Sequence, residues 1–166
     1  MAERGLALVY GGGNVGLMGI VADSVMAHGG AAIGIIPEAL MQKEVGHRGL
    51  TELHIVRNMH ERKQMMADRA DAFIAMPGGV GTFEELFETF TWAQLGYHDK
   101  PVGLLNVAGF YNGMLGFLNH AVSEGFLKQV HADMLHVSTE PEDMLARLAA
   151  APRVHVDKWQ EGRGKA

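Results

Sequence analysis

Two glycine-rich loops carry the residues with the clearest chemical potential. Gly11-Gly-Gly-Asn-Val-Gly16 and Pro77-Gly-Gly-Val-Gly-Thr82 each follow a short apolar run and precede a segment with helical periodicity. Glycine lets the backbone approach a phosphate closely, and the free N–H groups at a helix N-terminus then face its negative charge. Two such loops in one small domain favour a mononucleotide or a sugar phosphate held between them.

The first loop fits the pattern G-x-G-x-x-G, which is typical of dinucleotide sites. A dinucleotide site also needs an acidic residue about 20 residues further on, to bind the ribose. The nearest candidate, Glu38, lies 27 residues after Gly11 and follows Pro37. The loop therefore favours phosphate contact, a tight packing turn is the alternative, and NAD binding ranks below both.

The second loop leads to a carboxylate with two possible roles. Thr82 and Glu85 fit the S/T-x-x-E capping box, in which each side chain binds a backbone N–H at the helix start. Glu85 could instead be a catalytic carboxylate. Glutamine would serve nearly as well in a cap but not in catalysis, so the two roles are separable by experiment.

Two cations lie where a helix is expected to begin. Arg62 and Lys63 fall in the first turn of the segment after Asn58. Cations at that end oppose the helix dipole and lower the stability of the helix by about 0.3 kcal/mol or more each. A bound phosphate would offset the cost, whereas a solvated pair or an intramolecular salt bridge is the structural alternative.

Alternating segments must position these residues. Nearly continuous apolar runs predict strands buried on both faces, as in a parallel sheet. Periods of three and four apolar residues predict the helices between them. We expect a three-layer, doubly wound α/β fold in one domain over residues 1–158, with a frayed tail over 159–166. The predicted strands cover residues 6–10, 31–36, 51–56, 72–76, 101–105 and 135–138, and the predicted helices cover 14–28, 59–70, 82–95, 110–124 and 141–150.

Composition excludes several classes of protein. The 166 residues include no cysteine, which excludes disulfides, thiolate nucleophiles and Cys-ligated metal sites. The net charge of −5 disfavours electrostatic binding to nucleic acid. The nine histidines lack metal-ligand spacing, and no apolar run reaches the length of a membrane span. We expect a cytoplasmic protein with no nucleic-acid or membrane partner and no metal or redox cofactor.

These motifs together resemble one enzyme family. Pro77-Gly-Gly-Val-Gly-Thr-Phe-Glu-Glu85 matches the P-G-G-x-G-T-x-x-E motif of the LONELY GUY (LOG) family of cytokinin-activating enzymes, and Met59-His-Glu-Arg-Lys63 matches its arginine–lysine segment. Further matches lie at residues 9–19, 44–53 and 91–96. The likeness covers residues 5–150 and implies a Rossmann-like fold.

The resemblance implies a phosphoribohydrolase. Such an enzyme cuts the N-glycosidic bond of an N6-modified adenosine 5′-monophosphate, or of AMP, and releases the base and ribose 5-phosphate. Arg62 and Glu85 would be the catalytic pair of a homodimer, to which the helix over 82–95 and the following Gly96-Tyr97-His98 could contribute the contact. The substrate-binding residues would be Gly12, Gly13, Glu44, Lys63, Gly78, Gly79, Val80, Gly81, Thr82, Phe83, Glu84 and Thr91.

Other functions stay open at this point. A non-catalytic nucleotide or molybdenum-cofactor carrier on the same fold is the main alternative, and a Rossmann-type oxidoreductase is weaker. The label lysine decarboxylase, common among such sequences, has no support from a pyridoxal phosphate lysine motif. Relative to the family pattern, a first strand–helix unit is missing before residue 6, so we expect exposed strand edges and lower stability or altered dimerisation.

Overall fold

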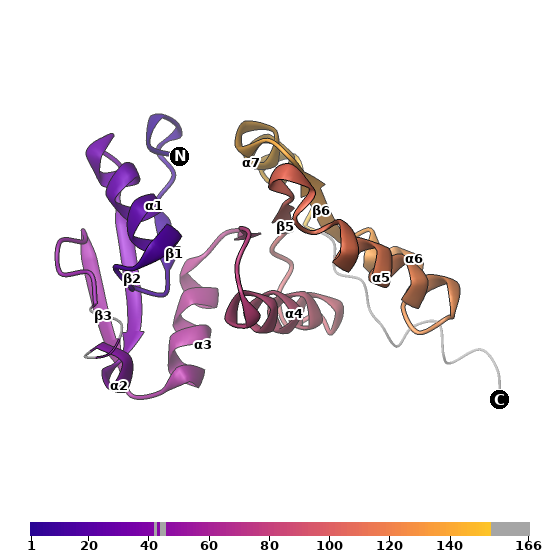
Figure 1. Ribbon diagram of the computed structural model, residues 1–166, viewed down its shortest axis with the longest axis horizontal. Coiled ribbons are helices and arrows are strands. Elements are labelled where there is room, and N and C mark those ends of the chain that lie inside the picture. Colours follow the sequence, from indigo (N-terminus) through magenta and orange to yellow (C-terminus); the bar gives the residue numbers. More distant parts are fainter. Residues whose placement is uncertain (42, 44–45, 154–166) are drawn as a thin grey trace. The chain divides into compact units, whose positions relative to one another are not determined.

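The computed structural model describes residues 1–41, 43 and 46–153 (Figure 1). The chain forms two compact units, Met1–Ala70 and Asp71–Ala166. Each unit contains a parallel three-stranded sheet flanked by helices. The predicted parallel α/β class is therefore confirmed.

The first unit holds the sheet in the order β1-β2-β3. All its pairs are parallel, with Tyr10 opposite Gly34 at one end of the first pair. The central strand is almost wholly buried, as its apolar run predicts. The elements are a 3₁₀ helix (Ala2–Arg4), β1 (Leu8–Tyr10), α1 (Gly16–Ala27), β2 (Ala32–Pro37), α2 (Glu38–Met41), β3 (Glu52–Val56) and α3 (Met59–Arg69).

The second unit holds the sheet in the order β4-β5-β6, also parallel throughout. The first glycine loop follows β1 and the second follows β4, so each loop leaves the carboxyl end of an edge strand. The elements are β4 (Phe73–Ala75), α4 (Val80–Gln94), β5 (Val102–Leu105), a 3₁₀ helix (Val107–Gly109), α5 (Asn112–Ser123), α6 (Gln129–Ala132), β6 (Leu135–Ser138) and α7 (Pro141–Ala150).

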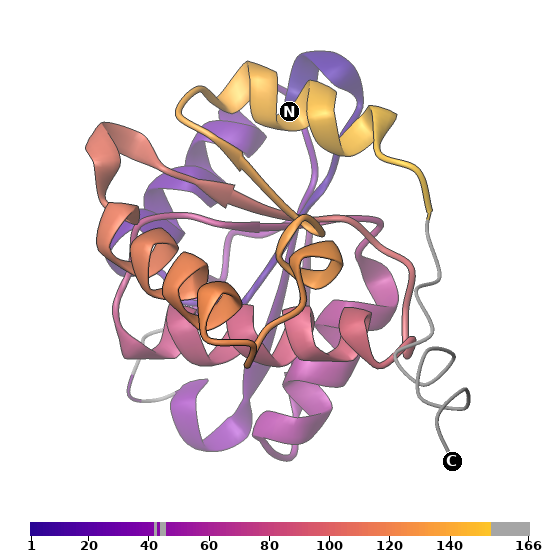
Figure 2. The same cartoon turned by 90° about the vertical axis from the view of Figure 1, so that its right-hand side faces the viewer.

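The strand β5 shows why a continuous apolar run predicts a central parallel strand. Val102 and Leu104 belong to the larger core with residues of α4. Leu105 packs with Met144 and Leu148 of α7 on the other side. Side chains alternate along a strand, so both faces need apolar residues once helices cover both. Figure 2 shows α7 on one side of this sheet and α4 and α5 on the other.

Each predicted strand and each long predicted helix is present, with ends displaced by at most two residues. The short helices α2 and α6 and both 3₁₀ turns were not predicted, because segments of three or four residues carry no periodic signal. A single domain over 1–158 stays a prediction, and the tail 159–166 lies outside the described residues. Within the described ranges, no helix is long and apolar enough to cross a membrane.

Candidate functional site

The first glycine loop is shaped by its own unit. Gly12 has φ +74°, and a Cβ atom there would lie 3.2 Å from the backbone nitrogen of Ile35. Its carbonyl accepts a hydrogen bond from the His47 N–H at 2.9 Å, and Gly13 forms an isolated antiparallel bridge with Gly46. The tight-turn interpretation therefore accounts for Gly12 by itself. Phosphate contact by Gly12 and Gly13 stays a prediction.

A buried histidine, His47, holds the segment 46–49, which pairs with this loop through Gly46 and His47. His47 Nδ1 accepts from the Gly49 N–H at 3.2 Å, so the ring proton resides on Nε2 and is donated to Asp23 Oδ1 at 2.8 Å. Asp23 lies on α1, 24 residues away in sequence. Because nothing in the sequence connects the two residues, sequence reasoning could place His47 only among the packing histidines.

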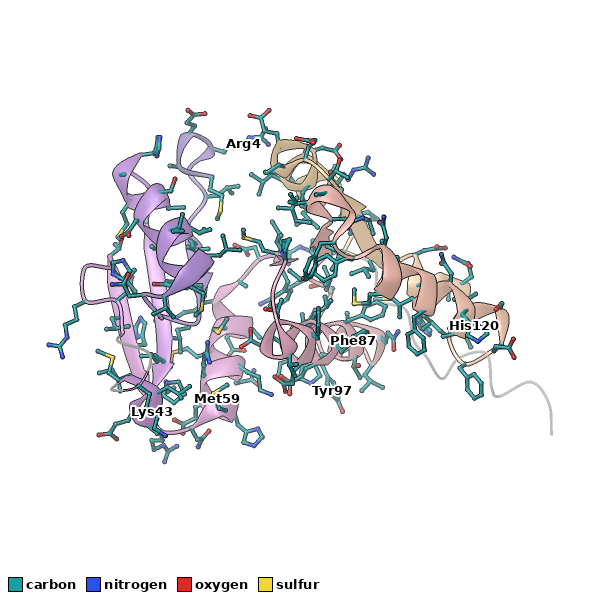
Figure 3. All side chains as sticks on the ribbon, viewed as in Figure 1. Arg4, Lys43, Met59, Phe87, Tyr97 and His120 are labelled. Atoms are coloured by element: carbon teal, nitrogen blue, oxygen red, sulfur yellow. The ribbon has the colours of Figure 1, made fainter. Side chains whose placement is uncertain are left out.

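Arg62 is buried beside the first loop. Its side chain is 7% exposed, and a Cβ atom on Gly11 would lie 1.8 Å from Arg62 Nη2. Nη1 also approaches Met59 Sδ at 3.6 Å; Met59 begins α3 and is labelled in Figure 3. The alternative of a solvated pair is therefore wrong for Arg62, while that of an intramolecular salt bridge stays open. Gly11 and Arg62 fit together because glycine leaves room for the guanidinium group.

The start of α3 offsets the cations that follow it. Asn58 is the N-cap, and its side chain accepts the Glu61 N–H at 2.9 Å. The Glu61 carboxylate accepts the Arg57 N–H at 3.0 Å and pairs with the Arg57 guanidinium, which lowers the pKa of Glu61. A cap and an acidic residue in the first turn both favour the helix. Lys63 is half-buried on the same helix.

The helix that follows the second loop starts earlier than predicted. The helix α4 starts at Val80 with Gly79 as N-cap, and no side chain caps it. Thr82 is therefore the third helical residue and not the cap, so the capping-box interpretation of Thr82 and Glu85 is wrong. The motif misled because glycine is itself an acceptable N-cap. The Thr82 side chain lies over Gly78, whose hypothetical Cβ would be 2.2 Å from Thr82 Oγ1.

Glu85 gains significance from this correction. It is the sixth residue of α4, half-buried, and too far along the helix to bind the N-cap backbone. Gly81 has no role in the fold that requires glycine, because a Cβ there would meet nothing within 4 Å and its φ is not positive. A Cβ on Gly79 would also meet nothing within 4 Å, but Gly79 is the N-cap of the helix. Most other predicted contact residues of this unit are exposed, namely Gly79, Val80, Gly81, Glu84 and Thr91, whereas Gly78, Thr82 and Phe83 are half-buried.

The predicted site residues fall into two groups. Gly12, Gly13, Arg62 and Lys63 belong to the first unit, and the residues from Gly78 to Thr91 belong to the second. The structure brings Arg62 next to the first loop and Thr82 next to Gly78. Glu44 lies outside the described residues. Joint action of Arg62 and Glu85 on one substrate stays a proposal.

The sequence did not indicate two residues near the second loop, Tyr111 and Asn106. Tyr111 is 1% exposed, and its hydroxyl donates to the Met76 carbonyl at 2.5 Å, just before the loop. Burial raises the pKa of this hydroxyl. Asn106 Oδ1 accepts the Tyr111 N–H at 2.7 Å. Tyr111 and Met76 are 35 residues apart, so no local pattern could have indicated the contact.

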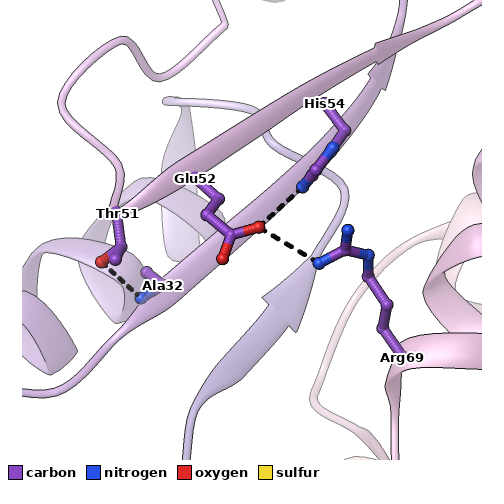
Figure 4. Close-up of polar contacts among 5 residues, drawn as sticks. All are labelled: Ala32, Thr51, Glu52, His54 and Arg69. Atoms are coloured by element: carbon purple, nitrogen blue, oxygen red, sulfur yellow. Dashed lines mark hydrogen bonds and ion pairs between the residues drawn. The ribbon is translucent and has the colours of Figure 1, made fainter.

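A charged cluster on β3 is separate from these loops. Glu52 Oε2 accepts hydrogen bonds from His54 Nε2 at 2.8 Å and Arg69 Nη1 at 3.1 Å (Figure 4). The bond from His54, followed by the charge of Arg69, lowers the pKa of Glu52. The cluster joins β3 to the end of α3 and is exposed, so its net contribution to stability is small. Within the described part of the chain, no group of three or more His, Asp or Glu is placed to hold a metal ion.

Fold and loops together define the class of the protein as Rossmann-like α/β. A solved structure, the molybdenum cofactor binding protein from the phototrophic bacterium Rippkaea orientalis, is similar with a TM-score of 0.65. It is 21% identical in sequence, and the match covers 90% of this chain and 79% of that one. At this identity the likeness supports the fold alone.

Sequence comparison identifies the family. The family model described as "Possible lysine decarboxylase" matches residues 18–148. The probable cytokinin riboside 5′-monophosphate phosphoribohydrolase LOGL1 of Oryza sativa subsp. japonica is 46% identical over 93% of this chain and 70% of its own length. LOG1 of Arabidopsis thaliana, a cytokinin riboside 5′-monophosphate phosphoribohydrolase, is 47% identical over 89% of this chain and 70% of its own length. LOG of Oryza sativa subsp. japonica, which bears the same enzyme name, is 57% identical over 78% of this chain and 53% of its own length.

The chain therefore belongs to the LOG family. It spans between 53% and 70% of the length of these three relatives.

Proposed function

We propose that this chain hydrolyses the N-glycosidic bond of adenosine 5′-monophosphate or an N6-modified form of it, releasing the free base and ribose 5-phosphate. The curated relatives carry the name of this activity, applied to cytokinin riboside 5′-monophosphates. The structural observation that carries the proposal is the start of α4. A glycine N-cap at Gly79, a second glycine with open space at Cβ at Gly81 and a carboxylate that does not cap the helix at Glu85 suit a nucleotide-binding helix start.

The reaction needs stabilisation of a positive charge on the sugar. As the bond between C1′ and the base nitrogen breaks, its electron pair stays with the nitrogen, and the ribose gains oxocarbenium character. A water oxygen then bonds to C1′, and the proton it loses balances the proton gained by the departing base. We assign Glu85 to this step, where its carboxylate stabilises the charge or aligns the water.

Arg62 has two possible roles in the proposal. Its guanidinium group, packed beside Gly11, could bind the 5′-phosphate through two parallel hydrogen bonds or assist the departing base. Substitution Arg62→Lys separates the roles, because lysine keeps the charge but not the paired donors. Loss of phosphate binding raises KM with kcat preserved, whereas loss of assistance to the base lowers kcat.

The direct test is chromatography of the products from AMP and N6-isopentenyl-AMP. Equal amounts of base and ribose 5-phosphate support the proposal, and release of a nucleoside with inorganic phosphate would contradict it. Tight nucleotide binding without any base release would favour the carrier alternative. The solved structure of a cofactor-binding protein does not by itself favour that alternative, since the likeness supports the fold alone.

A homodimer is part of the proposal. Large apolar side chains of the second unit are exposed, including Tyr97 at 75%, Phe117 at 65% and Phe126 at 90%. Figure 3 labels Tyr97 beyond the end of α4 and Phe87 within it. On α4 itself, Phe87 is exposed, whereas the face with Leu86 and Phe90 is buried against the sheet of the same unit. Such exposed apolar side chains favour a subunit contact, which sedimentation of the protein with and without Phe117→Asp would test.

We also propose a cytoplasmic location, because nucleoside monophosphates are produced and consumed inside cells. No nucleic-acid or membrane partner is proposed, in agreement with the net charge of −5. Fractionation of cells that express the full-length protein, with an antibody against it, would test the location.

A further inference from the structure

The turn after β5 is built around one buried asparagine. Asn106 accepts the Tyr111 N–H through Oδ1 at 2.7 Å and donates from Nδ2 to Asn112 Oδ1 at 2.9 Å. Its own N–H donates to the Ser138 carbonyl at 2.8 Å, at the end of β6. Because a backbone N–H must face an acceptor, the orientation of the Asn106 amide is fixed by its partners.

This turn holds strain. Ala108 has φ +51°, and within the described ranges it is the one non-glycine residue with positive φ. A residue with a Cβ atom is strained in this conformation, and such strain persists only where surrounding contacts impose it. The next residue, Gly109, has φ +73° and lies against the Asn112 amide. The asparagines therefore fix an unfavourable turn that delivers Tyr111 to one defined place.

Tyr111 contacts both ends of the second glycine loop. Its hydroxyl donates to the Met76 carbonyl, which immediately precedes Pro77. Its ring and that of Phe83, in the first turn of α4, are in a T-shaped arrangement with centroids 6.2 Å apart. One buried side chain thus joins the residue before the loop to a helical residue after it.

We infer that Asn106 and Tyr111 are positioning residues, which hold the loop 77–82 and the first turn of α4 in the conformation that receives the substrate. The inference rests on the proposed function for its kinetic part, since the substrate is the one proposed above. Glu85 stays in place without the pair because Leu86 and Phe90 anchor the following turns in the core. The pair therefore acts on substrate binding more than on the bond-breaking step.

The variant Tyr111→Phe tests the inference with the loss of one oxygen atom. We expect KM for AMP to rise about tenfold and kcat to change less than about threefold, as for a contact made equally in ground and transition states. Amide hydrogen exchange of the protein without substrate gives a second measurement. Faster exchange is expected at Phe83–Phe87, the first amides of α4 with helical hydrogen-bond partners.

Two control variants separate positioning from general destabilisation. Tyr10→Phe also removes a buried tyrosine hydroxyl, one that has no hydrogen-bond partner among the described residues, and leaves exchange at Phe83–Phe87 unchanged. Leu148→Val weakens the core on the α7 side of the second sheet, so it lowers Tm without a rise in KM. If Tyr111→Phe proves insoluble, Asn106→Asp is the second variant, because it keeps the acceptor for Tyr111 and loses the donor to Asn112.

The outcomes are distinct. Faster amide exchange confined to Phe83–Phe87, together with a raised KM for AMP, supports the inference. A lower Tm with unchanged KM and unchanged local exchange would overturn it, as would exchange that rises evenly across the second unit. If the wild-type protein releases no base, the proposed function fails, and the exchange measurement alone decides whether the pair holds the loop.

Discussion

The substitution Gly81→Ala should make the protein more stable and less active. Gly81 is the second residue of α4, has an ordinary helical backbone, and a Cβ there would meet nothing within 4 Å. Alanine at such a position stabilises a protein by about 0.4–1 kcal/mol, chiefly because the unfolded chain loses freedom. For a chain of this size that corresponds to a rise in Tm of roughly 1–4 °C.

The same methyl group should obstruct the substrate. If the nucleotide approaches the backbone at Gly81, a Cβ that is harmless to the fold occupies the approach. We expect kcat/KM for AMP to fall by about tenfold or more, equivalent to about 1.4 kcal/mol. The assays are thermal unfolding and base release on the same preparation.

Gly113→Ala is the matched control for this substitution. Gly113 is the second residue of α5, is exposed, and a Cβ there would also meet nothing within 4 Å. The control should gain similar stability and keep wild-type activity. Full activity of Gly81→Ala would refute the reasoning that substrate approaches this turn, and a lower Tm would refute the geometry given for α4.

Three further predictions concern the loops and the histidines. Gly11→Ala places a methyl group on the Arg62 guanidinium, so the free energy of unfolding measured in urea should fall by about 1–3 kcal/mol. Base release should fall further than this loss of stability explains, and wild-type kinetics would contradict the contact. Thr82→Ala should cost less than about 0.5 kcal/mol in urea unfolding, since Thr82 is not the cap, whereas a loss near 1 kcal/mol would restore the capping box. Burial lowers the pKa of His98 and His136 in the folded protein. As the pH falls, these histidines therefore take up protons first in the unfolded chain, where the histidine pKa is about 6.5. Their contribution to stability is complete above that pH and is lost as pH falls through the lower folded pKa values, so Tm should drop from pH 7.5 to 5.5 and drop less in His136→Gln.

The sequence predicts the framework because buried parallel strands leave a simple signal. The run Val102-Gly-Leu-Leu105 is apolar at every position since α4 and α7 cover opposite faces of β5. The glycine loops are found because each ends an apolar run, although the strands before them, β1 and β4, are only partly buried. Ends of helices are harder: at the start of α4, Gly79 and Thr82 are both acceptable caps, and only the backbone shows that Gly79 is used.

Contacts between distant residues could not be predicted. The bond from Tyr111 to the Met76 carbonyl and the bond from His47 to Asp23 join positions far apart in sequence, and neither has a local pattern. The burial of Arg62 also depends on a distant residue, Gly11, which leaves space for its guanidinium group. Catalytic roles for Arg62 and Glu85 came from family resemblance, and they stay predictions.

The central claim is that Glu85 acts in the cleavage of a nucleotide N-glycosidic bond. The most direct test is base release from AMP and N6-isopentenyl-AMP by the wild-type protein, by Glu85→Gln and by Glu124→Gln, an exposed site at the end of α5 with the same change of charge. We predict that Glu85→Gln folds but loses activity by about 10²-fold or more, while Glu124→Gln keeps it. Wild-type activity in folded Glu85→Gln would contradict the account.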